Sequence, residues 1–287
     1  MNGGPFQQDP PLSRIEFEYV RALVRRESAI VLDDSKTYLV ASRLLPLARG
    51  KGFQTVSALI AHLQAHPGDG LHTEAVEAIA TTETSFFRDL HPFNALRDEI
   101  LPELISRRRS SGRTLCLWSA GCASGQEPHS IAMILRDRFP SLATWNLQLL
   151  ASDLSSRMVE RSREGSYTQL EVNRGLPAQY LVRFFEQRED RWQLRSEVRD
   201  MFRYFQMNLA REWAPMPPVD VVLLRNVLIY FDVAERRAVL RRVRRLLRPD
   251  GYLMLGSAET TLNLDDLFTR VRVGGAVFYQ LAKGADE

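Results

Sequence analysis

The sequence contains few cysteines and no long hydrophobic run. Its two cysteines, Cys116 and Cys122, lie on or beside one predicted strand and give no disulfide framework, so we expect a reduced compartment, the cytoplasm. No uncharged apolar stretch approaches the roughly 18 residues that a membrane helix needs, and no basic segment followed by an apolar one opens the chain. We therefore expect no membrane insertion and no secretion signal.

The sequence also lacks a clear cluster of metal ligands. The five histidines are scattered along the chain. His62 and His66 share one helical face, but no acidic or cysteine side chains accompany them in a ligand pattern. The sequence therefore predicts no metal site.

The stretch from residue 115 to residue 133 carries the clearest local signal. The apolar run Leu115–Trp118 predicts a buried strand, and Gly121 and Gly125 predict a tight turn after it. Pro128 then marks the first turn of a helix. A strand, a tight turn and a helix in this order form the nucleotide-binding corner of a doubly wound α/β sheet. A tight turn that binds no ligand is the alternative.

This turn lacks the features that seat a phosphate. It has no third glycine and no P-loop lysine, and Glu127 stands where a phosphate requires positive charge. An acidic residue there suits a ligand that carries a cation, such as the amino group of S-adenosylmethionine.

A second acidic residue follows the next predicted strand. The run from Trp145 to Asp153 is apolar and ends in a carboxylate. In doubly wound nucleotide sites, an acid at the end of the second strand accepts hydrogen bonds from ribose hydroxyls. Asp153 occupies this place, although it could instead, or in addition, cap the helix expected after it.

Positive charge is modest in total but clustered. The formal net charge is +3 and the sequence pI is about 9.0, with arginines gathered at 25–26, 107–109 and 236–248. The last cluster alternates with apolar residues at helical spacing, which is typical of an amphipathic surface helix. Such a face could attract an acidic protein or a nucleic acid. No aromatic interleaving or nucleic-acid module accompanies it, so we expect no nucleic-acid partner.

Periodicity and composition predict four parts and one insertion. Residues 1–12 predict a disordered tail, and residues 13–80 an all-helical domain. Residues 81–92 form a linker that is unusual for its hydroxyls, adjacent aromatics and arginine. Residues 93–287 predict an α/β domain with a β insertion at about 176–206.

Six short motifs follow one another along the chain. They are Thr82–Arg88 (TETSFFR), Ala120–Pro128 (AGCASGQEP), Ala151–Asp153 (ASD), Asn208–Leu209 (NL), Leu224–Asp232 (LRNVLIYFD) and Leu247–Gly251 (LRPDG). In these motifs the chain resembles the chemotaxis receptor methyltransferases, the CheR family, from about residue 13 to residue 282. The resemblance implies an α/β fold, namely a Rossmann-like class I methyltransferase sheet with a helical N-terminal domain and a small β subdomain insertion.

The resemblance also implies an activity. Members of this family use S-adenosylmethionine, without a metal, to methylate glutamate side chains on the cytoplasmic helices of methyl-accepting chemoreceptors. The products are S-adenosylhomocysteine and glutamate methyl esters that serve sensory adaptation. We accordingly expect the cytoplasmic domain of a chemoreceptor as the partner, and a monomeric enzyme.

Site residues are carried over from the motifs. The resemblance places Arg88 nearest the reacting end of the cofactor and points Tyr230 towards the methyl group. Its cofactor contacts correspond to Thr82, Thr84, Arg88, Glu127, Asp153, Asn208, Leu209, Arg225 and Asn226. Thr82 departs from the asparagine often found in the family. On sequence alone, Arg88 could be a surface cation and Tyr230 a core aromatic.

A second departure concerns the β insertion. Some members grip a short aromatic-acidic tether at the receptor C-terminus through a glycine-rich loop between two strands of the insertion. The corresponding stretch here, Phe185–Trp192, has no glycine and is shorter. We therefore expect independence from a receptor C-terminal pentapeptide, with receptors reached through basic N-terminal helices.

Two other functions remain open at this point. One is a methyltransferase acting on a nucleic acid or a small acid, which the arginine clusters motivate. A glutamate carboxylate is already anionic near pH 7 and needs no general base, and no obvious base motif lies beside Asn226, which favours O-methylation. The other is a non-catalytic regulator that binds the cofactor, against which the presence of both Arg88 and Tyr230 argues.

Overall fold

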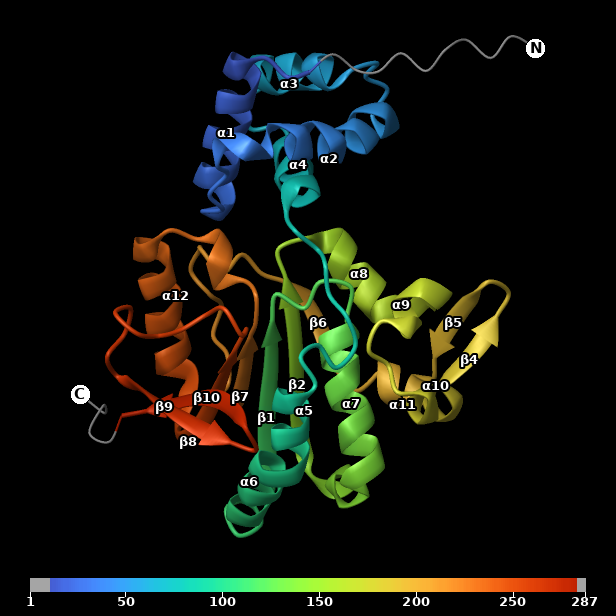
Figure 1. Cartoon of the computed structure of the whole chain (residues 1–287), viewed down its shortest axis with the longest axis vertical. Coiled ribbons are helices and arrows are strands. Elements are labelled where there is room, and N and C mark those ends of the chain that lie inside the picture. Colours follow the sequence, from blue (N-terminus) through green and yellow to red (C-terminus); the bar gives the residue numbers. More distant parts are fainter. Residues whose placement is uncertain (1–10, 283–287) are drawn as a thin grey trace. The chain divides into compact units, whose positions relative to one another are not determined.

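The computed structural model describes residues 11–282, which fall into two compact units (Figure 1). One unit ends at Thr81 and the other begins at Thr82. The expected disordered tail, residues 1–12, lies outside the described residues except for its last two, of which Leu12 is buried.

The first unit is helical throughout its described part. Its helices are α1 (Arg14–Ser28), η1 (Asp34–Lys36), α2 (Thr37–Gly50), α3 (Val56–Ala65) and α4 (Leu71–Ile79). Ser13 and Glu16 form a reciprocal capping box at the start of α1, and the Thr55 side chain caps α3. Val24, Val40 and other side chains at helical spacing form its buried core.

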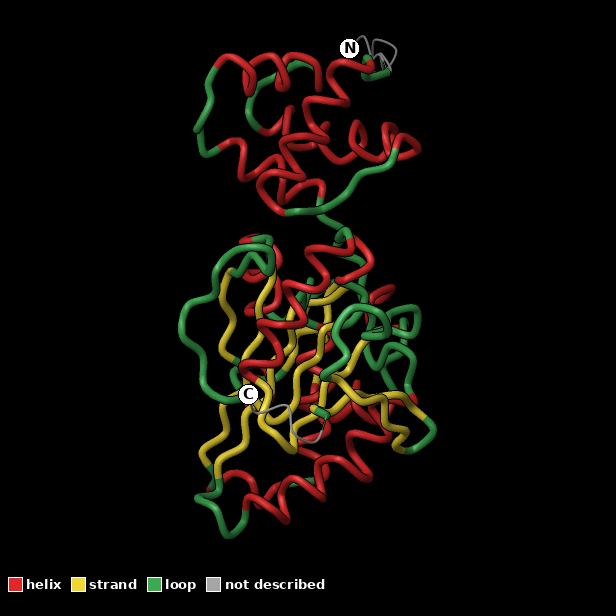
Figure 2. The backbone as a smooth tube through the Cα atoms, turned by 90° about the vertical axis from the view of Figure 1, so that its left-hand side faces the viewer, coloured by secondary structure: helices red, strands yellow, loops and turns green. Residues whose placement is uncertain are grey.

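The second unit is built on a seven-stranded sheet. Its strands are β1 (Thr114–Ala120), β2 (Asn146–Asp153), β6 (Arg203–Gln206), β7 (Val219–Leu224), β8 (Leu247–Leu255), β9 (Phe268–Val273) and β10 (Ala276–Leu281). The spatial order is β6-β2-β1-β7-β8-β10-β9, and Figure 2 shows the strands running alongside one another. The strands from β6 to β8 are parallel, whereas β10 is antiparallel to both neighbours. This is the doubly wound sheet that the sequence predicts, and the antiparallel hairpin β9–β10 completes one side of it.

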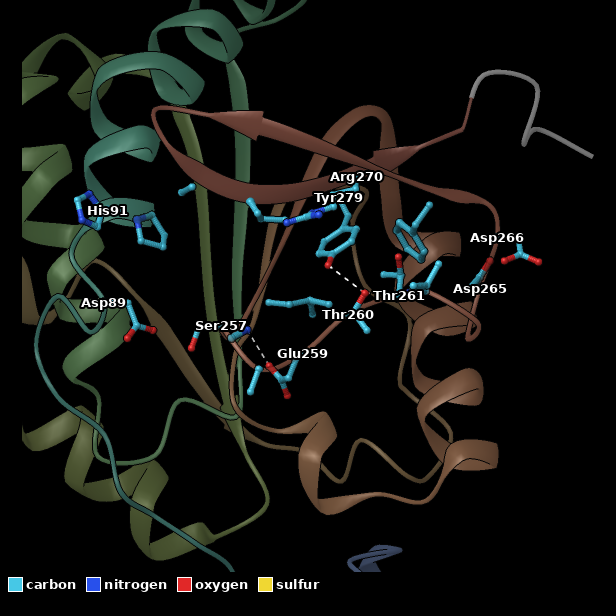
Figure 3. Close-up of a pocket in the computed structure, with 18 residues that line it drawn as sticks. Asp89, His91, Ser257, Glu259, Thr260, Thr261, Asp265, Asp266, Arg270 and Tyr279 are labelled. Atoms are coloured by element: carbon cyan, nitrogen blue, oxygen red, sulfur yellow. Dashed lines mark hydrogen bonds between the residues drawn. The ribbon is translucent and has the colours of Figure 1, made fainter.

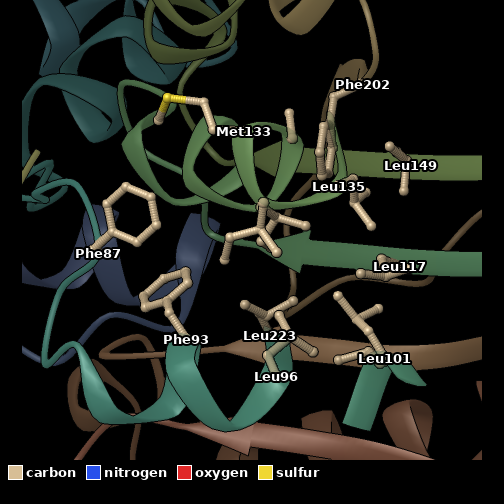
Figure 4. Close-up of a cluster of buried hydrophobic side chains, with 14 of the residues drawn as sticks. Phe87, Phe93, Leu96, Leu101, Leu117, Met133, Leu135, Leu149, Phe202 and Leu223 are labelled. Carbon is tan, nitrogen blue, oxygen red and sulfur yellow. The ribbon is translucent and has the colours of Figure 1, made fainter. Parts of the chain in front are cut away.

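Helices cover the sheet and share its hydrophobic core. They are α5 (His91–Ala95), the π-helix η2 (Leu96–Ile100), α6 (Leu101–Arg108), α7 (Gln126–Arg138), η3 (Pro140–Thr144), α8 (Ser156–Glu164), η4 (Leu228–Tyr230) and α12 (Val233–Leu246). Figure 4 shows Leu117 and Leu223 of the sheet among side chains from the helices, including Leu96 and Met133. These four residues are fully buried, so this face of the sheet is closed to water.

Alternate residues of β1 point to the other face, where Trp118 is fully buried. Its indole N–H donates to the hydroxyl of Ser152 at 3.0 Å, and its ring meets Trp213 edge-on at 5.1 Å. Arg242 of α12 lies over the Trp213 ring. The arginine-rich helix therefore packs on the Trp118 face.

The insertion differs from the expected β segment at about 176–206. A three-stranded sheet, β3 (Ser166–Thr168), β4 (Phe185–Arg188) and β5 (Arg191–Leu194), is interleaved with α9 (Gln169–Asn173), α10 (Ala178–Phe184) and α11 (Ser196–Arg199). It begins earlier than expected, and its last expected segment, β6, pairs in parallel with β2 of the main sheet. The short alternating pattern of β6 predicts a strand but does not identify the sheet that it joins.

Candidate functional site

The parallel strands end at the carboxyl end of the sheet, and predicted site residues lie directly after several of them. β1 ends just before the glycine turn, and β2 ends at Asp153. Asn208 follows β6, and Arg225 follows β7 directly. The connections reverse direction between β1 and β7, which is where open α/β sheets bind ligands.

Two glycines shape the turn after β1. Gly121 and Gly125 have φ values of +79° and +93°, in the left-handed region that favours glycine. A Cβ at Gly121 would lie 2.5 Å from Cγ2 of Val227, and one at Gly125 would lie 3.0 Å from Ser162. The turn therefore packs directly against the segment that follows β7.

Asp153 holds the same turn from the end of β2. Its Oδ2 accepts a hydrogen bond from the backbone N–H of Ala123 at 2.8 Å, and its Oδ1 accepts from that of Ser155 at 3.0 Å. The N-cap of α8 is Ser155, whose side chain accepts from the N–H of Met158. Asp153 is thus an organiser of the glycine turn rather than the cap of the next helix.

Arg225 forms a buried bridge. Its guanidinium bonds to Oε2 of Glu127 at 3.0 Å, to Oδ2 of Asp89 at 2.7 Å and to the carbonyl oxygen of Arg88 at 2.8 Å. Only 2% of the Arg225 side chain is exposed, and Glu127 also accepts from the Ser119 hydroxyl. The guanidinium therefore ties the segment before α5 to the start of α7, and its expected contact with the cofactor stays a prediction.

The adjacent aromatics of the linker anchor it. Phe86 is fully buried and meets Tyr167 and Phe185 of the insertion edge-on at 5.0 and 5.8 Å. The N–H of Phe87 donates to the Ser130 hydroxyl of α7 at 3.0 Å. These contacts fix the polypeptide between Thr82 and α5 on the second unit.

Four predicted site residues have side-chain polar groups that form no hydrogen bond within the described residues. Thr82, Thr84, Arg88 and Tyr230 are half-buried. Within residues 11–282, neither their hydroxyls nor the Arg88 guanidinium forms a hydrogen bond. The structure therefore places Arg88 beside the Arg225 bridge through its backbone, while its side chain stays available.

The remaining predicted residues lie on the two turns beyond β6 and β7. Asn208 accepts a hydrogen bond from the N–H of Ala210, and Leu209 is buried with its carbonyl bonded to Arg242. Asn226 adopts a left-handed conformation with φ of +58°. Its Oδ1 is buried and has no hydrogen-bond partner among the described residues.

The acceptor-rich character of this edge fits S-adenosylmethionine. Glu127 and Asp153 are buried carboxylates, and the Asn226 amide oxygen has no donor among residues 11–282. An ammonium group and ribose hydroxyls would donate to such oxygens, whereas a phosphate would be repelled. Glu127 and Asp153 would hold the polar groups of the cofactor's amino acid and ribose.

Two side chains near the turn are unsuited to nucleophilic or base chemistry. Burial raises the pKa of the Cys122 thiol well above its usual value, so it stays protonated near neutral pH. Burial also lowers the pKa of His129 to about 3, and both ring nitrogens are hydrogen-bonded to tyrosines. Neither side chain is therefore suited to remove a proton from a methyl acceptor.

A cavity of about 830 Å³ opens beside the end of β8, between residues 255–266 and the edge hairpin (Figure 3). Asp89, Glu259 and Tyr279 contribute to its wall. None of the predicted site residues lines it, although two wall residues, Asp89 and Glu259, bond to Arg225 and to the backbone of Asn226.

Glu259 is the residue that the sequence reasoning missed. Its carboxylate accepts hydrogen bonds from the N–H groups of Asn226 and Val227 at 2.6 and 2.9 Å. The signal was present, because an acid shortly after the apolar run Tyr252–Leu255 belongs at the same sheet edge as Asp153. The run predicts a strand, but the spacing alone does not assign a role to the acid.

Comparisons with known proteins identify the family of this chain. Residues 82–275 match the model of the CheR methyltransferase SAM binding domain, and residues 15–80 match that of the CheR methyltransferase all-alpha domain. The chain belongs to the CheR methyltransferase family. It is a methyltransferase that uses S-adenosylmethionine. The expected fold class, the cofactor and the transfer of a methyl group are thereby confirmed.

Named relatives of this CheR chain cover nearly its whole length. The chemotaxis protein methyltransferase Cher2 of Pseudomonas putida is 36% identical over 93% of this chain and 98% of its own length. Chemotaxis protein methyltransferase 1 of Pseudomonas aeruginosa is also 36% identical, over 92% and 97%. The Escherichia coli chemotaxis protein methyltransferase is 32% identical, over 95% and 92%.

The described residues contain neither a membrane-spanning helix nor a cluster of metal ligands. No helix in residues 11–282 combines the length and apolar character of a membrane span. Within the same range, no three His, Cys, Asp or Glu side chains are grouped as metal ligands.

Proposed function

We propose that this protein transfers a methyl group from S-adenosylmethionine to glutamate carboxylates on the cytoplasmic helices of chemoreceptors, giving methyl esters for sensory adaptation. The observation that carries the proposal is the half-buried residue Arg88, whose guanidinium makes no hydrogen bond within the described residues and whose carbonyl oxygen accepts from the buried Arg225. An unpaired guanidinium fork matches the geometry of an incoming carboxylate. We take the protein to act in the cytoplasm as a monomer.

The proposed mechanism is positional. S-adenosylmethionine, when bound, supplies an electrophilic methyl group. Arg88 binds the acceptor carboxylate through its oxygens, and the Tyr230 hydroxyl donates a further hydrogen bond that orients it. Thr82 and Thr84 line the cofactor from the linker, and Asn208, Leu209, Arg225 and Asn226 complete the pocket. No general base is required, which agrees with the neutral His129 and the protonated Cys122.

The arginine clusters give little support to a nucleic-acid acceptor. Arg108 is paired with Asp220 and Asp250, and Arg244 with Asp265. Arg242 donates to the carbonyl oxygen of Leu209. Several of the clustered arginines therefore stabilise the fold through bonds within the second unit.

We further propose that receptors are reached through the helical unit, without a C-terminal pentapeptide tether. The β4–β5 hairpin turns over two residues, Glu189 and Asp190, without a glycine-rich loop. On the helical unit, Ile15 and Tyr38 are exposed by 78% and 85%, and α1 ends in Arg25 and Arg26. Exposed apolar side chains and a basic helix end on the same unit suit an amphipathic acidic helix.

The methyl acceptor is tested with radiolabelled S-adenosylmethionine and receptor-containing membranes. We expect label that base releases as volatile methanol, because esters hydrolyse and N-methyl groups do not. Arg88→Ala should abolish this release, whereas Arg272→Ala, which removes an exposed arginine of β9, should leave it intact. Label that resists base would move the acceptor to nitrogen and reject the proposal.

Tether independence is tested by calorimetry with an isolated pentapeptide from the receptor C-terminus. We expect no measurable binding at concentrations near 100 µM, roughly −5.5 kcal/mol on the affinity scale. Micromolar binding would show that the short β4–β5 turn does not prevent tether recognition.

A further inference from the structure

The Glu259 carboxylate collects four backbone N–H groups. Its Oε2 accepts from Asn226 at 2.6 Å and from Gly256 at 2.7 Å, the latter shown in Figure 3. Its Oε1 accepts from Val227 at 2.9 Å and from Ile229 at 3.3 Å. Three of the four donors lie in the segment that joins β7 to α12, so one side chain fixes most of that connection.

The conformation of this segment explains why an anion binds it. The left-handed conformation of Asn226, at φ of +58°, turns successive N–H groups towards one point. Asparagine tolerates this conformation better than most residues with a Cβ, but the conformation still gains from support by its surroundings. Glu259 supplies that support as a carboxylate from the same chain.

Close packing reinforces the arrangement. A Cβ at Gly256 would lie 2.6 Å from Nδ2 of Asn226 and 2.7 Å from Oε2 of Glu259. The bare backbone at Gly256 therefore lets the Asn226 side chain and the Glu259 carboxylate occupy the same small volume. As a result, both the backbone and the side chain of Asn226 are held in place.

The segment held by Glu259 is the one that carries the proposed chemistry. Arg225, Asn226 and Tyr230 all lie on it, and Val227 packs against the glycine turn at Gly121. A shift of this segment would move Tyr230 and, through Val227, the glycine turn after β1. Glu259 itself reaches the region only through backbone N–H groups.

We propose that Glu259 is a positioning residue for this methyltransferase: it holds the segment 225–230 in the conformation that binds the cofactor and presents Tyr230 to the acceptor. The role of Glu259 in presenting Tyr230 to the acceptor rests on the proposed function. Its role in cofactor binding rests only on the use of S-adenosylmethionine by this family. Glutamine at this position cannot reproduce the contacts, because its NH₂ group would face two backbone donors.

The experiment compares Glu259→Gln with Glu103→Gln in the full chain. Glu103 is a matched control, because it is a partly buried glutamate that accepts from Tyr252 far from the carboxyl edge. Calorimetry would measure the Kd of S-adenosylhomocysteine, steady-state assays kcat and KM, and thermal unfolding the Tm.

We expect Glu259→Gln to raise this Kd, and the KM for S-adenosylmethionine, about tenfold or more, since two charge-assisted contacts are lost. Its kcat should fall as well, while Glu103→Gln should lower the Tm without changing the Kd.

Three outcomes are distinguishable. Wild-type Kd and kcat in Glu259→Gln would overturn the inference. An equal loss of affinity in Glu103→Gln at a similar Tm would also overturn it, because the effect would follow general destabilisation. If wild-type protein yields no base-labile methyl ester but Glu259→Gln still binds S-adenosylhomocysteine more weakly, the proposed acceptor fails and the positioning role stands.

Discussion

His129 is a buried histidine whose protonation state is set by its neighbours. The Tyr167 hydroxyl donates to the carbonyl oxygen of Ser124 at 2.9 Å, so it accepts from His129 Nδ1–H at 2.6 Å. The Tyr204 hydroxyl then donates to Nε2 at 2.7 Å. This chain of hydrogen bonds connects the insertion, α7 and the glycine turn, and it requires a neutral imidazole.

Stability should therefore depend on pH through His129. Burial lowers its pKa to about 3, whereas an unfolded histidine titrates near 6.5. As the pH falls below about 6.5, the unfolded state binds a proton that the native state does not. The free energy of unfolding should then fall by up to about 1.4 kcal/mol per pH unit. Urea unfolding between pH 7.5 and pH 5.5 measures this slope.

His129→Gln is the control for this slope. Glutamine still offers one donor and one acceptor to the tyrosines but does not titrate. We expect a less stable protein with a flatter pH dependence over the same range. An unchanged slope would assign the pH dependence to other groups.

At the scale of elements, the site depends on two turns that touch. The glycine turn after β1 meets the segment after β7 where Gly121 faces Val227. Asp153 holds the first turn and Glu259 the second, each through backbone N–H groups. Acids at the ends of β2 and beyond β8 thus set the spacing between two connections that are far apart in the sequence.

Gly121→Ala tests this contact. The new Cβ would lie 2.5 Å from Val227, and we expect cofactor affinity to fall about tenfold or more as the two turns separate. Gly275→Ala is a matched control, because Gly275 has the same φ of +79° but no atom within 4 Å of the added Cβ. Its alanine should cost stability, by about 1 kcal/mol, without affecting binding.

Adding Val227→Ala to Gly121→Ala should restore part of the affinity, since it removes the methyl group that collides. Calorimetric titration with S-adenosylhomocysteine gives the Kd of the wild type, Gly121→Ala, Gly275→Ala and the double variant. Equal affinities for Gly121→Ala and Gly275→Ala would reject the collision as the cause.

Local patterns in the sequence predicted many of these elements, and long-range contacts explain what they did not predict. The apolar run Leu115–Trp118 and the amphipathic arginine helix appear within β1 and α12, because each pattern reflects its own burial. By contrast, the placement of β6 in the main sheet depends on pairing with β2. The burial of Arg225 and the contacts of Glu259 likewise depend on partners dozens of residues away, which spacing alone does not identify.

At the scale of the molecule, the charged residues of the proposed site and the ion pairs that stabilise the fold lie at opposite ends of the parallel strands in the second unit. At the opposite edge of the sheet from the site, Arg108 is paired with Asp220 at 2.7 Å and with Asp250 at 2.5 Å. Asp220 is fully buried and also accepts from the N–H of Cys116. Hydrogen bonding to Arg108 lowers the pKa of Asp250.

Arg108→Leu should therefore affect folding but not binding. Removing the guanidinium leaves the Asp220 carboxylate buried with weaker compensation, at a cost of about 3–5 kcal/mol in the free energy of unfolding. The exposed neighbour Arg109→Leu should be close to neutral. Urea unfolding and S-adenosylhomocysteine calorimetry together check the prediction, which a large change in affinity of folded Arg108→Leu would contradict.

The Trp118 contact has an optical consequence. The indole N–H bonds to Ser152, the residue before Asp153, and the ring meets Trp213. Indole emission is sensitive to such hydrogen bonds, so occupancy at the end of β2 should change the fluorescence of the unlabelled protein. A Trp118→Phe variant would identify the source of that change. Cofactor binding should then be measurable as a change in intrinsic tryptophan fluorescence, in a stopped-flow experiment and without an added dye.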